Sequence, residues 1–391
     1  MVENRFFRLT LDPARGTVSS LIDRRSGREL VDTNAPQGFG QYLYERFDRD
    51  QVQAFVKSYV KIDAEWGTNE LGKPSLTPAS QSPYQGLSPK NFKVRCEQTP
   101  FSQQVIMTAS ATGSLTTPVT TRLTLYHDLP WLDLEITIHN KPFQAWPEAG
   151  WMCLPFNVDE PNFLLGRLGS IVDPAKDIVA GCNFHQFALN GGLTVTDPAG
   201  RGVGLCALDS PLVSLGEPGC WKYSKTFTRK NPRVYINLFN NQWSTNFRLW
   251  NSGTWSSRVR LWSVAHSDAE KNLVTPSEEA RCPLVGIVAE GPAGRLPAQQ
   301  AGLEISKRGV KVTAFLPDPS GRGFILRLWE LAGSSGNCQV RLPAGMQARQ
   351  AQPLDLRDNP IGAPIQIRGG KFEAPIWEFA PASFWVETLP Q

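Results

Sequence analysis

Segments that alternate between apolar and polar residues run along most of the chain, and they constrain its fold more than any other feature. Near the start, Phe7, Leu9 and Leu11 alternate with polar residues. A period of two is typical of half-buried β-strands. Glycines and prolines, 33 and 31 in number, separate these segments as turn residues do. The sequence therefore predicts an all-β fold.

Further segments rich in β-branched and aromatic residues also predict strands. Helical patterns are scarce: one helix is expected near residues 50–57 and another near 267–273, with Ser267 as its N-cap. The predicted strands cover residues 105–111, 119–126, 131–139, 202–208, 233–238, 257–264, 310–316, 324–331 and 384–388.

Two proline-rich stretches indicate breaks between packed regions. Residues 71–89 have the composition of a surface loop, because they hold few side chains that could repay ordering by burial. A second break at 275–300 surrounds the apolar fragment LVGIVA. We place the domain boundary near Pro276, between a large β domain at 1–275 and a smaller one at 276–391.

Charge and cysteine content narrow the function classes. The chain has 40 Lys and Arg against 36 Asp and Glu, a net charge of +4 without a basic run, so nucleic acid is not expected as a partner. Early charges at Glu3, Arg5 and Arg8 argue against an export signal, and no apolar run approaches the ~18 residues of a membrane span.

Seven cysteines without a C-x-x-C pair indicate free thiols. A cytoplasmic location is expected.

The sequence contains little evidence of a metal-binding or nucleophile motif. The four histidines form no H-x-x-x-H or H-E-x-x-H pair. The triplet His266-Ser267-Asp268 has a spacing that can chelate, but Ser267 and Asp268 are also ordinary helix-start residues. The glycines at 200–204 predict a hairpin turn rather than a phosphate cradle, because a strand and not a helix follows them. We therefore expect no metal site in this chain.

A pair of carboxylates lies in the segment WLDLEITI at 131–138. Asp133 and Glu135 are two apart, so both project from one face of the strand. Such a pair can serve as acid and base on a sugar. The alternative is the wet face of an antiparallel strand, and His139 at the strand end is likewise explained by a turn.

The segment NLFNNQWSTNFRLWNSGTW at 237–255 combines aromatic rings with amides and fits neither a strand nor an amphipathic helix. Asn and Gln match vicinal sugar hydroxyls, and a Trp face can cover a pyranose ring. Alternatively, the rings plug the end of a sandwich and the amides satisfy the loop backbone. The candidate carbohydrate-binding or interface residues are Asn240, Asn241, Trp243, Thr245, Asn246, Arg248 and Trp250.

Several blocks along the chain, in order, resemble the C-terminal β region of glycoside hydrolase family 38 α-mannosidases. The block NNQWSTN at 240–246 is the most specific. The others are residues 3–12, 16–23, 27–31, 204–211 and 326–330 with Gly333. The resemblance implies a large antiparallel supersandwich, similar to galactose mutarotase domains, followed by a smaller β-sandwich.

The family hydrolyses glycosides with an aspartate nucleophile, a second carboxylate and a zinc ion. The resemblance implies that these groups belong to a catalytic barrel that this chain lacks, so no residue here inherits a catalytic or zinc-binding role. We expect a module that forms one wall of the sugar site, binds mannosides and docks a separate catalytic barrel. A free-standing carbohydrate-binding module is the alternative. A sugar isomerase using Asp133, Glu135 or His139 is a third hypothesis.

Overall fold

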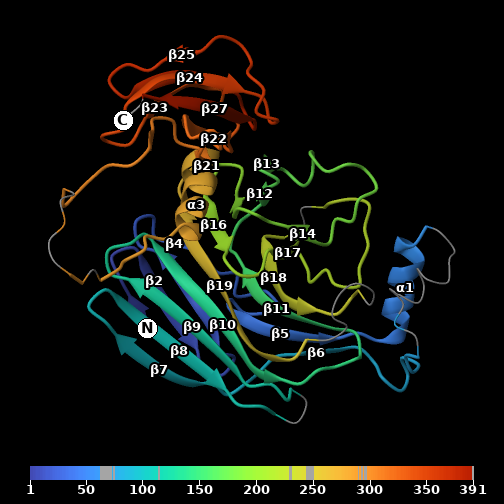
Figure 1. The fold of residues 1–391 in the computed structure, drawn as a ribbon. Helices are drawn as coiled ribbons and strands as arrows, with labels where there is room; N and C mark the ends of the chain where they lie inside the picture. Colours follow the sequence, from blue (N-terminus) through green and yellow to red (C-terminus); the bar gives the residue numbers. More distant parts are fainter. Residues whose placement is uncertain are drawn as a thin grey trace. The chain divides into compact units, whose positions relative to one another are not determined.

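The computed structural model describes every residue except 62–72, 74, 113–114, 229–230, 244–250, 289, 292–293, 295–296 and 390–391. The described residues form antiparallel sheets with few helices (Figure 1), and the predicted all-β fold is confirmed. Two compact units are present. The larger holds Met1–Leu165 and Val172–Asp268, and the smaller holds Gly166–Ile171 and Ala269–Gln391.

The larger unit is built on two broad sheets and a small one. In spatial order, the nine-stranded sheet consists of β13 (Ser170–Val172), β12 (Asn162–Arg167), β15 (Leu193–Thr196), β16 (Gly202–Ala207), β19 (Gly253–Val264), β10 (Trp131–Lys141), β9 (Val119–Tyr126), β8 (Ser102–Ala109) and β7 (Lys93–Gln98). The six-stranded sheet consists of β14 (Phe187–Ala188), β17 (Leu212–Leu215), β18 (Arg233–Asn240), β11 (Glu148–Pro155), β5 (Gln41–Arg46) and β6 (Gln85–Leu87). The four-stranded sheet consists of β1 (Val2–Glu3), β2 (Phe7–Asp12), β3 (Thr17–Asp23) and β4 (Arg28–Glu29).

The two broad sheets share one apolar core. Leu123 and Leu134 from the nine-stranded sheet join Tyr42, Met152 and Ile236 from the six-stranded sheet in a single buried cluster. The alternation of β10 explains its place, because its even-numbered apolar residues are buried while its odd-numbered residues up to His139 stay partly exposed. The predicted large antiparallel sandwich is therefore confirmed.

Strand β11 escaped the sequence analysis because it does not alternate. All eight of its residues are buried, and it pairs with β18 on one side and β5 on the other. A strand with both faces covered needs no polar side, so the period-two signal disappears.

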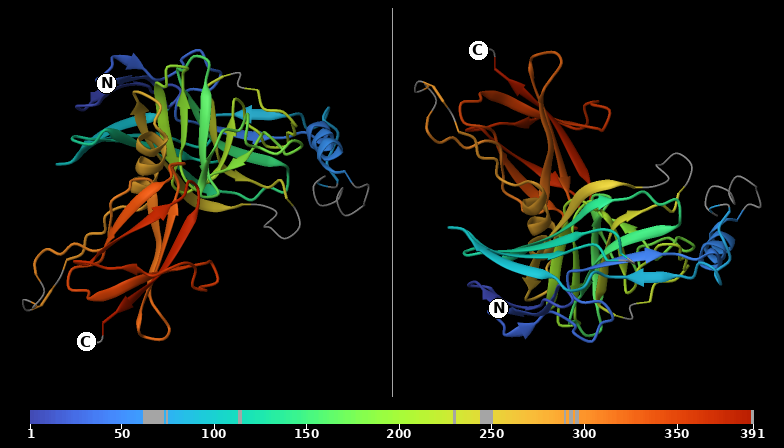
Figure 2. Two further views of the ribbon diagram at one scale, coloured as in Figure 1. Left: turned by 90° about the horizontal axis from the view of Figure 1, so that it is seen from above. Right: turned by 90° about the horizontal axis from the view of Figure 1, so that it is seen from below.

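Helix α1 (Arg49–Tyr59) covers part of the six-stranded sheet. Asp48 caps its first turn in a capping box with Gln51. Phe55 and Val56 join Trp151 of β11 in a second apolar cluster. Figure 2 shows this helix beside the strands of the larger unit. The helix predicted at 50–57 is confirmed.

The smaller unit contains a five-stranded and a three-stranded sheet with a shared core. The first is ordered β21 (Val310–Pro317), β22 (Gly323–Glu330), β27 (Pro381–Thr388), β24 (Ala348–Leu354) and β25 (Ile365–Gln366). The second is ordered β20 (Glu304–Ile305), β23 (Gly336–Arg341) and β26 (Lys371–Ile376).

Two local predictions were wrong in their limits. The second helical segment starts later than expected, as η1 (Glu270–Val274) followed by α3 (Thr275–Arg281), and Ser267 does not cap it. Pro276, where we placed the boundary, lies in the first turn of α3, which continues directly from η1. The proline-rich stretch 71–89 is not all loop, since β6 adds a short edge strand to the six-stranded sheet.

Candidate functional site

The structure describes three of the seven candidate sugar-contacting residues. Asn240 ends β18, and Asn241 and Trp243 follow it. Trp243 is 43% exposed and packs nearly perpendicular to the Tyr59 ring, with the ring centres 6.3 Å apart. The other four candidates, Thr245, Asn246, Arg248 and Trp250, lie outside the described residues.

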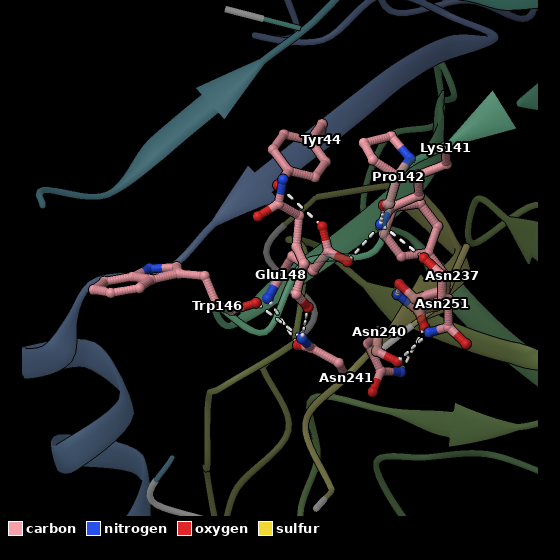
Figure 3. Close-up of polar contacts among 11 residues, drawn as sticks. Tyr44, Lys141, Pro142, Trp146, Glu148, Asn237, Asn240, Asn241 and Asn251 are labelled. Atoms are coloured by element: carbon pink, nitrogen blue, oxygen red, sulfur yellow. Dashed lines mark hydrogen bonds and ion pairs between the residues drawn. The ribbon is translucent and has the colours of Figure 1, made fainter. Parts of the chain in front are cut away.

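Asn241 uses its whole amide inside the protein. Its Oδ1 accepts from the backbone N–H of Glu148 at 2.9 Å, and its Nδ2 donates to the carbonyls of Trp146 at 2.8 Å and Gln144 at 3.2 Å (Figure 3). The side chain is buried. Asn241 therefore fixes the β10–β11 connection against the end of β18.

Asn240 belongs to a second chain of amides. Its Nδ2 donates to Asn237 Oδ1 at 2.8 Å, and its Oδ1 accepts from the backbone of Gln242 at 3.1 Å. Asn251 Nδ2 donates to the Asn240 carbonyl at 3.0 Å. In the described part of this segment, the amides satisfy loop backbone, as one of the two sequence interpretations expects. Sugar contact by the candidate residues stays a prediction.

A buried ion pair that sequence reasoning missed lies beside these amides. Lys141 Nζ contacts Glu148 Oε1 at 2.6 Å, and their side chains are only 3% and 0% exposed. Lys141 also donates to the carbonyls of Pro142 and Asn251, both at 3.0 Å, while Tyr44 donates its hydroxyl to Glu148 Oε2 at 3.0 Å (Figure 3).

A change of register at the end of β10 brings the lysine inside. Between Ile138 and Lys141 the pairing with β19 shifts, and Asn140 takes a positive φ of 49°. An odd-numbered residue thereby joins the buried face of the strand. Alternation alone puts Lys141 on the wet face. The burial of its partner was easier to infer from the sequence, because Glu148 directly precedes the apolar run AGWMCLP.

Burial dominates the electrostatics of this pair. Desolvation raises the pKa of Glu148, although the charge and hydrogen bond of Lys141 and the Tyr44 hydroxyl act in the opposite direction. The same burial, with the neighbouring carboxylate, raises the pKa of Tyr44. Tyr44 therefore stays a neutral donor at physiological pH.

The ion pair forms one wall of a pocket of about 220 Å³. Polar side chains dominate its lining, which combines the ends of β5, β10 and β11 with the edge strand β6 and the turn before β9. The lining residues are Tyr44, Arg46, Gln85, Leu115, Thr116, Thr117, Lys141, Pro142, Gln144 and Glu148. This arrangement can bind a small polar molecule through side-chain donors and acceptors.

A second buried carboxylate, Glu45, faces the aromatic cluster under α1. Trp151 Nε1 donates to it at 2.7 Å and the Tyr84 hydroxyl at 2.8 Å. Burial raises its pKa, against the effect of these two donors. Burial also raises the pKa values of the Cys153 and Cys220 thiols well above their usual range, so they are neutral.

Asp133 and Glu135 lie on one face of β10, as predicted. Asp133 forms a two-pronged pair with Arg260 of β19 at 2.7 and 2.9 Å and accepts from the Tyr126 hydroxyl at 2.8 Å. His139 Nε2 is 2.9 Å from the Thr120 hydroxyl on the neighbouring strand. These contacts are cross-strand pairs that stabilise the sheet.

Within the described residues, no three His, Cys, Asp or Glu side chains come together as a metal site requires. The zinc of the resembling family therefore has no matching ligand set among them. None of the helices in the same part of the chain has the length and apolar character needed to cross a bilayer.

Comparisons with known proteins show which families have a similar sequence or fold. Residues 2–146 match the family model described as Glycosyl hydrolases family 38 C-terminal domain. A protein in Glycosyl Hydrolase Family 38 from Enterococcus faecalis has a similar fold, with a TM-score of 0.65 and 12% identity over 99% of this chain and 44% of that chain. An alpha-mannosidase from Enterococcus faecalis V583 gives a TM-score of 0.64 and 13% identity over 99% of this chain and 42% of that one.

A galactose mutarotase-like protein from Lactobacillus casei aligns with 67% of this chain and 98% of its own length, with a TM-score of 0.35 and 12% identity. A search of curated proteins finds no match. This chain spans less than half the length of the two Enterococcus proteins. Residues 2–146 thus match the C-terminal domain of glycosyl hydrolases family 38, which confirms the predicted resemblance to that region of the family 38 α-mannosidases.

Proposed function

We propose that this chain is the C-terminal β module of an α-mannosidase-like glycoside hydrolase, which docks a catalytic domain and forms one wall of its sugar site. The observation that carries the proposal is the correspondence of nearly the whole chain with less than half of an alpha-mannosidase. A module that corresponds to one portion of an enzyme is expected to work beside the portion that performs the chemistry.

An exposed apolar segment supports docking. Leu284, Val285, Ile287 and Val288 are each at least 86% exposed, within the fragment LVGIVA of the smaller unit. Four large apolar side chains gathered in five residues are unusual on a free surface and typical of an interaction site. The catalytic domain is the proposed occupant, because more than half of the similar family 38 chains lies outside the region matched here.

Half-exposed Trp243 supports the sugar wall. Its ring follows the amide-rich end of β18 and offers a flat surface that can cover a pyranose. Zinc and the aspartate nucleophile belong to the catalytic domain in this proposal, so no step of the chemistry passes through residues of this chain.

Calorimetric titration of the full chain with a separately produced catalytic domain of a family 38 α-mannosidase tests docking. We expect a complex, and we expect the double variant Val285→Asp/Ile287→Asp to bind at least tenfold more weakly, because two charges would enter an apolar contact. Leu356→Asp, at an isolated exposed leucine of the same unit, is the matched control and should leave the affinity unchanged. Absence of a complex at micromolar concentration, or equal affinity of the double variant, would contradict docking.

The exposure of Trp243 also favours a second candidate, a free-standing carbohydrate-binding module. In that case Trp243→Ala should weaken oligosaccharide affinity by about 1 kcal/mol or more, without any catalytic partner. Unchanged affinity in this variant would remove the segment around Trp243 from the binding site.

A further inference from the structure

We infer that the pocket beside the Lys141–Glu148 pair binds a single neutral pyranose ring. The inference deepens the proposed function and rests on it for the class of ligand, a sugar. This site differs in location from the sugar wall proposed at Trp243, because the pocket lies at the junction of β5, β6, β10 and β11.

The buried pair determines which chemistry the pocket accepts. All three N–H groups of Lys141 are used, by Glu148, Pro142 and Asn251. The ammonium therefore has no hydrogen bond left for a bound anion. The Glu148 carboxylate receives one donor on each oxygen and is fully buried, so it acts on the pocket through its charge rather than through a direct contact. A neutral ligand suits this wall, whereas an anion would lie beside a carboxylate.

The other polar side chains of the lining remain available. Five side chains of the lining make no hydrogen bond to any residue that the structure describes: Arg46, Gln85, Thr116, Thr117 and Gln144. A guanidinium, two amides and two hydroxyls together supply both donors and acceptors. Such a mixed set matches sugar hydroxyls, each of which donates one hydrogen bond and accepts others.

Arg46 is held in place without using its donors. Its Cζ lies 4.6 Å from the centre of the Trp146 ring, and its backbone pairs with Glu148 on one side and Gln85 on the other. A stacked guanidinium keeps its N–H groups free for a ligand and loses little side-chain entropy on binding.

Volume limits the ligand to one ring. The pocket of about 220 Å³ corresponds to roughly seven water molecules at ~30 Å³ each. It lies below the ~300–1,000 Å³ of sites for drug-sized ligands. A single hexose fits this scale, and a longer glycan has to continue outside the pocket.

Titration of the full chain with methyl α-mannoside and with methyl α-glucoside, followed by NMR, tests the inference. We expect saturable binding of at least one glycoside. Gln85→Trp, at an exposed position on the edge strand, should abolish it by filling the pocket without altering the core. Thr117→Val, which removes one hydroxyl, should weaken it by about three- to tenfold.

Matched controls separate pocket effects from general ones. Gln81→Ala lies outside the pocket on an exposed turn, and Thr121→Val removes a buried hydroxyl of β9 elsewhere. Both should bind as the wild type does. Binding of inorganic phosphate alone, no saturable binding of either glycoside, or binding unaffected by Gln85→Trp would overturn the inference. Because this assay needs no catalytic partner, its failure is distinguishable from a failure of docking.

Discussion

Removal of the Lys141 ammonium by Lys141→Met tests the energetic role of the buried pair. The substitution keeps an apolar stem of similar length but leaves the fully buried Glu148 carboxylate with only the Tyr44 hydroxyl. The carbonyls of Pro142 and Asn251 lose their donor as well. Breaking one partner of a buried pair costs about 3–5 kcal/mol, and we expect a loss of unfolding free energy in that range.

The double variant Lys141→Met/Glu148→Gln removes both charges and keeps an acceptor for Tyr44. Two carbonyls still lack a donor, at about 1 kcal/mol each, so we expect recovery of about 2 kcal/mol relative to Lys141→Met. Lys57→Met, at an exposed position of α1, is the control and should stay within about 0.5 kcal/mol of wild type.

Urea unfolding of the full chain, with the transitions of the two units fitted separately, measures these differences. The pH gives an independent check. Without its ammonium, Glu148 has a folded pKa even further above its unfolded value, so the penalty is absent below about pH 4 and complete above the folded pKa. The loss in Lys141→Met should therefore be larger at pH 8 than at pH 4. A loss equal to that of Lys57→Met, or no recovery of stability in the double variant, would refute the reasoning.

Three further predictions follow from other contacts. Asn241→Ala should lower the free energy of unfolding by at least about 2 kcal/mol, because it strips partners from three backbone groups, whereas the exposed control Asn34→Ala should not; equal effects in urea unfolding would contradict this. Burial raises the folded pKa of Glu45, so wild type should lose stability relative to Glu45→Gln as the pH rises above about 4.5; a pH-independent difference in thermal unfolding would count against it. A thiol reagent should modify three exposed cysteines in the native chain and the remaining four only in denaturant; fast reaction of a fourth would be inconsistent with the structure, in which the exposed thiols are Cys96, Cys182 and Cys282.

Alternation and turn residues were sufficient to predict much of the sheet structure. Strand β9 (Val119–Tyr126) has the predicted limits, since one of its faces meets the core and the other does not. Gly200 lies between β15 and β16, while Gly202 and Gly204 belong to β16 itself, and the antiparallel pairing of the two strands confirms a hairpin. There Gly200 takes a positive φ of 77°, which favours glycine.

The candidate site was harder to predict, because it depends on contacts between distant segments. Lys141 is buried through a register shift that no local pattern encodes. Asn241 contacts residues almost a hundred positions earlier, and its amide looks identical in sequence whether it binds a sugar or a backbone. The pocket likewise joins residues 44, 46, 85, 115–117, 141, 142, 144 and 148. The residue types in the sequence indicated recognition of a polar ligand. The location of the site could be found only from the fold.

Hydrolysis of 4-nitrophenyl α-D-mannopyranoside tests the central claim most directly. The purified chain is assayed alone, a separately produced family 38 catalytic domain is assayed alone, and the two are then combined in equimolar amounts. Our account predicts no turnover by the chain alone and a gain in kcat/KM of at least tenfold for the mixture over the catalytic domain. Turnover by this chain without a partner, or a mixture no faster than the catalytic domain, would contradict it.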